Sequence, residues 1–73
     1  MTDSEEVLVD TRGHKCPVPT LRLRRALEGL QAGVVVRLLA DDPMARIDVP
    51  HFCNQQGHEL VEAAETTFRV RKR

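Results

Sequence analysis

The sequence has no tryptophan and no tyrosine, and it contains only two phenylalanines among 73 residues. Proteins that hold single-stranded nucleic acid stack the bases on aromatic side chains, and this chain has almost none to offer. Its eleven basic and eleven acidic residues cancel, so no net charge draws it to a phosphate backbone. The composition therefore argues against direct binding of nucleic acid.

Cysteines and long apolar runs are also scarce. Two cysteines are too few for the disulfide scaffold of a small secreted domain. The first six residues are polar and acidic, without the apolar stretch of a signal peptide behind them. The longest apolar run, residues 34–40, contains Arg37 and is too short to span a membrane. We therefore expect residues 1–73 to form one domain in the reducing cytoplasm, with residues 1–6 disordered and no membrane association.

Apolar periodicity predicts four strands and two helices. Leu23, Leu27 and Leu30 recur at the i, i+4, i+7 spacing of an amphipathic helix. Phe68 and Val70 alternate with arginines, which is the pattern of a half-buried strand. We expect strands at Val7–Asp10, Val34–Ala40, His58–Glu65 and Phe68–Lys72, and helices at Pro17–Leu30 and Asp48–Gln56.

The second helix is the hardest to place. Asp41 and Asp42 are followed by a proline, as at many helix starts, but Pro50 would interrupt a helix that began there. We therefore predict a turn over Pro43–Ile47 and a helix that begins at Asp48, a good N-cap residue.

This order of elements predicts the fold class. Strands that are separated by helices pair in parallel, whereas the last two strands can form an antiparallel hairpin. With right-handed crossovers in so short a chain, both helices lie on one face of the sheet. We expect an α+β protein, a two-layer α/β sandwich in the order β-α-β-α-β-β with a mixed four-stranded sheet. Its open face would carry solvated arginines, namely Arg37, Arg69 and Arg71.

A cysteine lies where the first strand leads into the first helix, in the run Cys16-Pro17-Val18-Pro19. The prolines fit only in the first turn, where backbone amides have no intrahelical partner to lose. The positive end of the helix dipole and the amide of Val18 should favour the thiolate of Cys16 by about one pKa unit. Lys15 adds a positive charge beside it. The alternative is a small hydrophobic cysteine that happens to precede a helix.

The run DTRGHKCPVP, from Asp10 to Pro19, resembles the D-x-x-G-x-x-C-P-x-P signature of the TusA (SirA-like) family of small sulfur carriers. The similarity continues along nearly the whole chain, at Ala40-Asp41-Asp42-Pro43, Asp48-Val49-Pro50, Phe52-Cys53 and Gly57-His58-Glu59-Leu60.

The resemblance implies a two-layer sandwich and a carrier that works without a cofactor. It implies that a cysteine desulfurase or sulfurtransferase loads a persulfide onto Cys16 and that a downstream protein accepts the sulfur. The pathways it suggests are tRNA thiolation, molybdenum-cofactor assembly and sulfur oxidation. Such a carrier is not an enzyme with turnover of its own, and serial docking is simplest for a monomer. The residues expected to support the cysteine are Asp10, Gly13, Pro17 and Pro19 of the signature, together with Lys15 through its positive charge.

Three other interpretations remain open. Cys16 could be a redox-sensing or peroxidatic thiol that forms a sulfenic acid and is resolved by Cys53, although a buried hydrophobic role is the default for Cys53. Zinc ligands are available at two H-x-C pairs and one further histidine, but their spacing is unlike that of structural zinc sites. A third interpretation is a docking surface for an acidic partner, formed by Arg22, Arg24 and Arg25. The potential zinc ligands are His14, Cys16, His51, Cys53 and His58.

Overall fold

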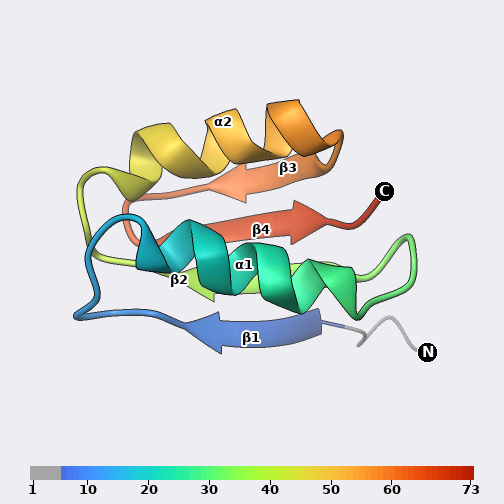
Figure 1. Cartoon of the computed structure of the whole chain (residues 1–73), viewed down its shortest axis with the longest axis horizontal. Helices are drawn as coiled ribbons and strands as arrows, with labels where there is room; N and C mark the ends of the chain where they lie inside the picture. Colours follow the sequence, from blue (N-terminus) through green and yellow to red (C-terminus); the bar gives the residue numbers. More distant parts are fainter. Residues whose placement is uncertain (1–5) are drawn as a thin grey trace.

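The structure is a computed structural model, and it describes residues 6–73. Four strands and two helices follow one another in the predicted order, β-α-β-α-β-β (Figure 1). Their bounds are β1 Glu6–Asp10, α1 Val18–Glu28, β2 Val35–Leu39, α2 Ala45–Gln56, β3 Glu59–Ala63 and β4 Thr67–Arg71.

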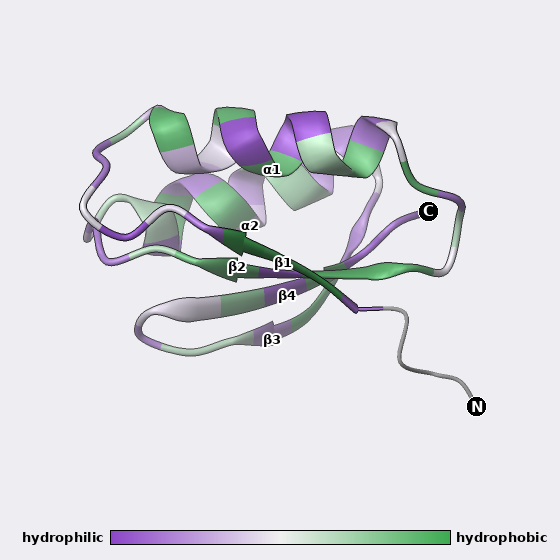
Figure 2. Ribbon diagram, turned by 90° about the horizontal axis from the view of Figure 1, so that it is seen from below, coloured by the Kyte–Doolittle hydropathy of each residue, from purple (hydrophilic) through white to green (hydrophobic). Residues whose placement is uncertain are grey.

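The strands form one mixed sheet in the order β1-β2-β4-β3. β1 and β2 are parallel, while β4 is antiparallel to both β2 and β3. Figure 2 shows both helices on the same face of this sheet. The predicted α+β sandwich is therefore confirmed. No helix within residues 6–73 is long and apolar enough to cross a membrane.

Apolar side chains from both layers meet between the sheet and the helices. Leu23 and Leu27 lie one helical turn apart on α1, and both are buried. Alternate residues of the two central strands point toward them, because side chains of a strand alternate between its faces. The buried apolar residues of the core are Val9, Leu23, Leu27, Val36, Leu38, Ala40, Ala45, Val49, Cys53, Phe68 and Val70.

The second helix begins three residues earlier than the sequence predicts. It starts at Ala45 instead of Asp48 and contains Pro50 in its interior. Proline removes one helical hydrogen bond and costs about 3 kcal/mol. The burial of Ala45, Val49 and Cys53, spaced by four residues on one side of α2, offsets that cost. The predicted turn over residues 43–47 is present at Pro43 and Met44 but was wrong for residues 45–47, because the prediction weighed the proline without this packing.

The other predicted bounds differ less. α1 ends at Glu28 instead of Leu30, and β3 ends at Ala63 instead of Glu65. The chain turns back directly after β3, and the amide of Ala64 donates to the carbonyl of Thr67 across this turn. Glu6 belongs to β1, so the prediction of disorder through residue 6 was wrong for this residue. The rest of that predicted segment, residues 1–5, lies outside the described residues.

The open face of the sheet carries charges that pair with each other. Arg69 contacts Glu6 at 2.8 Å and Glu62 at 3.3 Å, and Arg71 contacts Glu59 at 2.7 Å. The two arginines of β4, a central strand, thus form ion pairs with carboxylates on both outer strands, β1 and β3. This arrangement agrees with the solvated charged face expected from the sequence.

Candidate functional site

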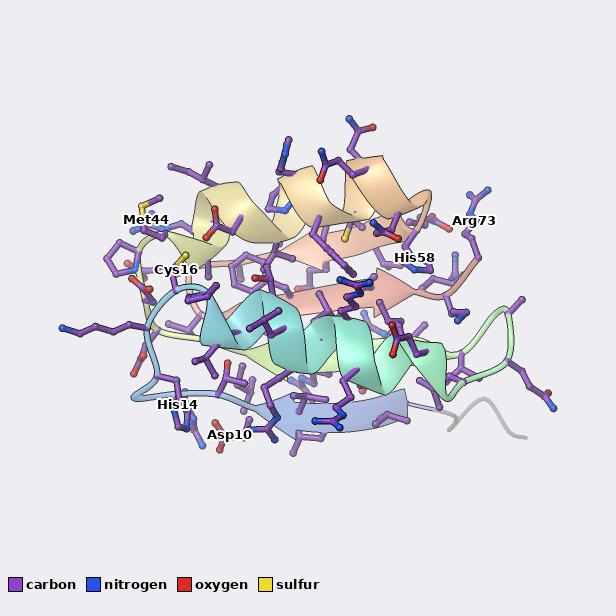
Figure 3. All side chains as sticks on the ribbon, in the orientation of Figure 1. Asp10, His14, Cys16, Met44, His58 and Arg73 are labelled. Carbon is purple, nitrogen blue, oxygen red and sulfur yellow. The ribbon has the colours of Figure 1, made fainter. Side chains whose placement is uncertain are left out.

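Cys16 lies in the loop between β1 and α1, where the first turns of both helices meet at one end of the molecule (Figures 1 and 3). The cysteine is exposed, and the neighbouring Pro19 is buried beneath the start of α1. The peptide bond between Cys16 and Pro17 is cis. Cys16 contributes to the wall of a shallow hollow, whose other lining residues are Pro19, Thr20, Asp42, Ala45 and Asp48.

Two carboxylates from the β2–α2 connection hold the cysteine loop. The amide of Gly13 donates to Asp41 Oδ1 at 3.0 Å, and the amide of Cys16 donates to Asp42 Oδ2 at 2.5 Å. The other oxygen of Asp42 accepts from the amide of Met44 at 3.2 Å, which fixes the carboxylate itself. Hydrogen bonds to charged groups are the stronger kind, so these bonds order the loop in the protein on its own.

A third carboxylate contacts the sulfur directly. Cys16 Sγ donates a hydrogen bond to Asp48 Oδ2 at 2.8 Å. This bond, the loss of some hydration at the sulfur and the negative charges of Asp48 and Asp42 raise the pKa of the Cys16 thiol above its ordinary value. The structure therefore favours the neutral thiol.

The prediction of a stabilised thiolate was wrong in sign. The amide of Val18, expected to face the sulfur, instead donates to the carbonyl of Lys15 at 2.9 Å. α1 starts at Val18 with Pro17 as its N-cap, and the Lys15 side chain is not among the groups that shift the Cys16 pKa. The nearby carboxylates outweigh the helix end.

Replacing Asp48 with asparagine should lower the pKa of Cys16, because a neutral amide no longer repels the thiolate. The thiolate fraction at pH 7 should rise severalfold, and the rate of alkylation by iodoacetamide should rise with it. The rate of this reaction measured against pH gives the pKa directly. Glu65→Gln, which removes an exposed carboxylate from the β3–β4 turn, is the matched control. An unchanged pKa in folded Asp48→Asn protein would contradict the role of this hydrogen bond.

The remaining predicted site residues shape the loop. Asp10 ends β1, and its carboxylate accepts hydrogen bonds from the Arg12 side chain at 3.0 and 2.8 Å, which lower its pKa to about 2. Gly13 has a positive φ of 87°, a conformation that other residues rarely adopt. Pro19 lies in the first turn of α1, as the sequence predicts, whereas Pro17 is the N-cap, one residue before the helix instead of its first residue. Asp10 forms its hydrogen bonds with Arg12 and none with the cysteine.

Sequence reasoning did not assign a role to the three carboxylates. Asp41, Asp42 and Asp48 lie within the segments that carry the family resemblance, but they were interpreted only as helix starts. The clue available in the sequence was the concentration of aspartates immediately after a central strand. In a parallel βαβ unit the loops after both strands lie at the same edge of the sheet.

Comparison with known proteins identifies the family of the chain. Residues 7–72 match the family model described as Sulfurtransferase TusA. The chain belongs to the TusA family. A Sulfur carrier protein TusA from Pseudomonas putida strain F1 is 39% identical over 66 residues, which cover 89% of this chain and 82% of the relative. Another, from Pseudomonas aeruginosa strain PAO1, is 40% identical over 65 residues with the same coverage.

A solved structure extends the similarity to three dimensions. The crystal structure of a SirA-like protein from Desulfitobacterium hafniense superposes with a TM-score of 0.68 and 29% sequence identity. The alignment covers 89% of this chain and 92% of that chain. This TusA-family chain therefore shares both sequence and architecture with its relatives.

The second cysteine has a different environment. Cys53 lies on α2 in the core and is 2% exposed, and burial raises the pKa of its thiol to about 11. A disulfide with the exposed Cys16 would require the core to open.

Within residues 6–73, no three histidine, cysteine or acidic side chains are grouped so that they could hold a metal. The three arginines of α1 are exposed, and their role as a docking surface stays a prediction.

Cys53→Ala should lower the free energy of unfolding by about 1–2 kcal/mol, because it shrinks a fully buried side chain. The change is measured by urea denaturation, with the slope of the transition as a check on two-state behaviour. Sulfur uptake should stay at the wild-type level. Loss of uptake in folded Cys53→Ala protein would make this cysteine a second functional thiol.

Proposed function

We propose that this TusA-family protein carries sulfur as a persulfide on Cys16, in a relay between two other proteins. The observation that supports the proposal most is the position of this cysteine: it is exposed, on a loop held by two carboxylates, in a chain whose relatives are named sulfur carriers. A carrier sulfur must enter the sites of two different partners, and an exposed, ordered loop allows this without an ordering cost at each encounter.

The chemistry requires only the thiol. The Cys16 thiolate attacks the terminal sulfur of the donor persulfide, a new S–S bond forms on Cys16, and the donor cysteine leaves as a thiolate. In the second transfer, an acceptor thiolate attacks the sulfur that Cys16 carries, and Cys16 leaves as the thiolate. Sulfur moves at a constant oxidation level, so neither step needs an added oxidant, reductant or cofactor.

A cysteine desulfurase or a sulfurtransferase is the donor that we propose, and a sulfur-accepting protein is the second partner. The pathways suggested by the resemblance are tRNA thiolation, molybdenum-cofactor assembly and sulfur oxidation. In each of them the protein acts as a carrier and not as an enzyme with independent turnover.

The test is loading by a cysteine desulfurase in the presence of cysteine, followed by mass spectrometry of the intact protein and of the Cys16 peptide. We expect one additional sulfur atom on that peptide, removed again by dithiothreitol. A peptide that gains oxygen atoms, or a Cys16–Cys53 bridge, in protein purified without reductant would favour the redox interpretation. Absence of any sulfur gain with several desulfurases and sulfurtransferases would contradict the proposal.

A further inference from the structure

The hydrogen bond between Cys16 and Asp48 exists only while the carrier is empty. Its donor is the proton on Sγ, and its acceptor is a half-buried carboxylate oxygen at 2.8 Å. In a persulfide, Sγ is bonded to the second sulfur at about 2.0 Å and no longer carries a proton. Loading therefore removes this hydrogen bond, whatever the ionisation of the terminal sulfur.

The loaded form also encounters unfavourable charge. Asp42 and Asp48 both line the hollow around the sulfur, and no cationic side chain of residues 6–73 forms an ion pair with either. Asp42 cannot turn away without giving up the amides of Cys16 and Met44. An anionic terminal sulfur, the reactive form of a persulfide, would face two carboxylates that repel it.

We propose that Asp48 sets how strongly Cys16 holds its sulfur, by stabilising the empty thiol and destabilising the loaded persulfide. The inference rests on the proposed carrier function. The exchange is Cys16–S–S⁻ + R–SH ⇌ Cys16–SH + R–S–S⁻, in which one S–S bond breaks, another forms, and the proton of the acceptor thiol passes to Sγ. Both effects of the carboxylate favour the right-hand side, so Asp48 makes the loaded carrier a better sulfur donor than a simple persulfide.

This role differs from acid–base catalysis in what it changes. A residue that only moves a proton during the reaction accelerates transfer in both directions equally and leaves the equilibrium constant unchanged. A residue that contacts the empty and loaded forms with different energies changes the equilibrium constant itself. An equilibrium measurement therefore separates the two roles.

The experiment equilibrates wild-type and Asp48→Asn proteins with a defined mixture of glutathione persulfide and reduced glutathione, without oxygen. Thiols and persulfides are then trapped by alkylation, and the loaded fraction is read from the mass of the Cys16 peptide. We expect Asp48→Asn to hold more sulfur, so that the equilibrium constant of the exchange written above falls about fivefold to tenfold, because a charge-assisted hydrogen bond is roughly twice as strong as the neutral one that asparagine can accept. Glu65→Gln should match wild type. An unchanged constant in folded Asp48→Asn protein overturns the proposal.

A second measurement does not depend on the folding of a variant. In wild-type protein, the ¹³C resonance of the Asp48 carboxylate should shift when Cys16 is loaded, because the carboxylate loses its donor. The carboxylate of Asp10, which is bound by Arg12, should not shift. An Asp48 resonance that is unaffected by loading also overturns the proposal. Since glutathione persulfide replaces the protein donor here, failure of desulfurase loading would contradict the carrier function alone and would leave both measurements interpretable.

Discussion

Cys16→Ser should take up no sulfur from a loaded desulfurase and should unfold at the same urea concentration as the wild type. Serine has no thiol on which a persulfide can form, so the loss of uptake should be complete. The fold should survive because Cys16 is exposed and outside the core, and because a serine hydroxyl can donate to Asp48 in place of the thiol. Loading is measured by mass spectrometry and stability by urea denaturation.

The matched variant for this experiment is Cys53→Ala. It removes the other cysteine and should load one sulfur like the wild type, while losing stability as described above. The pair thus separates sulfur chemistry from stability, because each variant is expected to change only one of them. Persulfide on Cys16→Ser at the wild-type stoichiometry would falsify the assignment of the carrier sulfur.

Phe68→Ala should lower the free energy of unfolding by about 3–5 kcal/mol. Phe68 is 1% exposed in β4, where it pairs with Leu38 of β2 and with Ala63 of β3. A chain of 73 residues has roughly 4–11 kcal/mol of stability in total, at about 0.05–0.15 kcal/mol per residue. The truncation therefore removes a large part of the stability and should lower the urea midpoint accordingly.

Leu8→Ala provides the control for the loss of an apolar side chain. Leu8 lies on β1 and is 61% exposed, so its truncation should change stability by no more than about 0.5 kcal/mol. Urea midpoints of the two variants give the comparison. A loss below about 1 kcal/mol for Phe68→Ala would mean that the core repacks around the missing ring, contrary to its burial between both layers.

The layers, the order of elements and the position of the cysteine were predictable because each rests on residues close together in the sequence. Leu23 and Leu27 define the buried side of α1, and the prolines after Cys16 can occupy only the start of a helix. Such local patterns do not depend on how the rest of the chain folds.

The start of α2 and the acidity of the thiol were predicted incorrectly because both depend on distant contacts. Pro50 is tolerated since Val49 and Cys53 pack on the core, which the local sequence does not reveal. The Cys16 pKa depends on Asp48, a residue 32 positions away, while the helix-end argument considered only neighbours in the sequence. The sign of a pKa shift requires the full set of nearby charges.

The alignment of β1 with β2 controls the distance between the sulfur and its carboxylate. Asp10 pairs with Leu39 where the two parallel strands end, and Thr11 extends the alignment by donating from its amide and hydroxyl to the Leu39 carbonyl. The smallest slip that keeps the same side chains on the core face is two residues, or about 6.6 Å of strand. Such a slip would carry the cysteine loop beyond hydrogen-bonding reach of α2. The pKa of Cys16 therefore depends on the registration of β1 with β2, which is set by residues that lie outside the hollow around the sulfur.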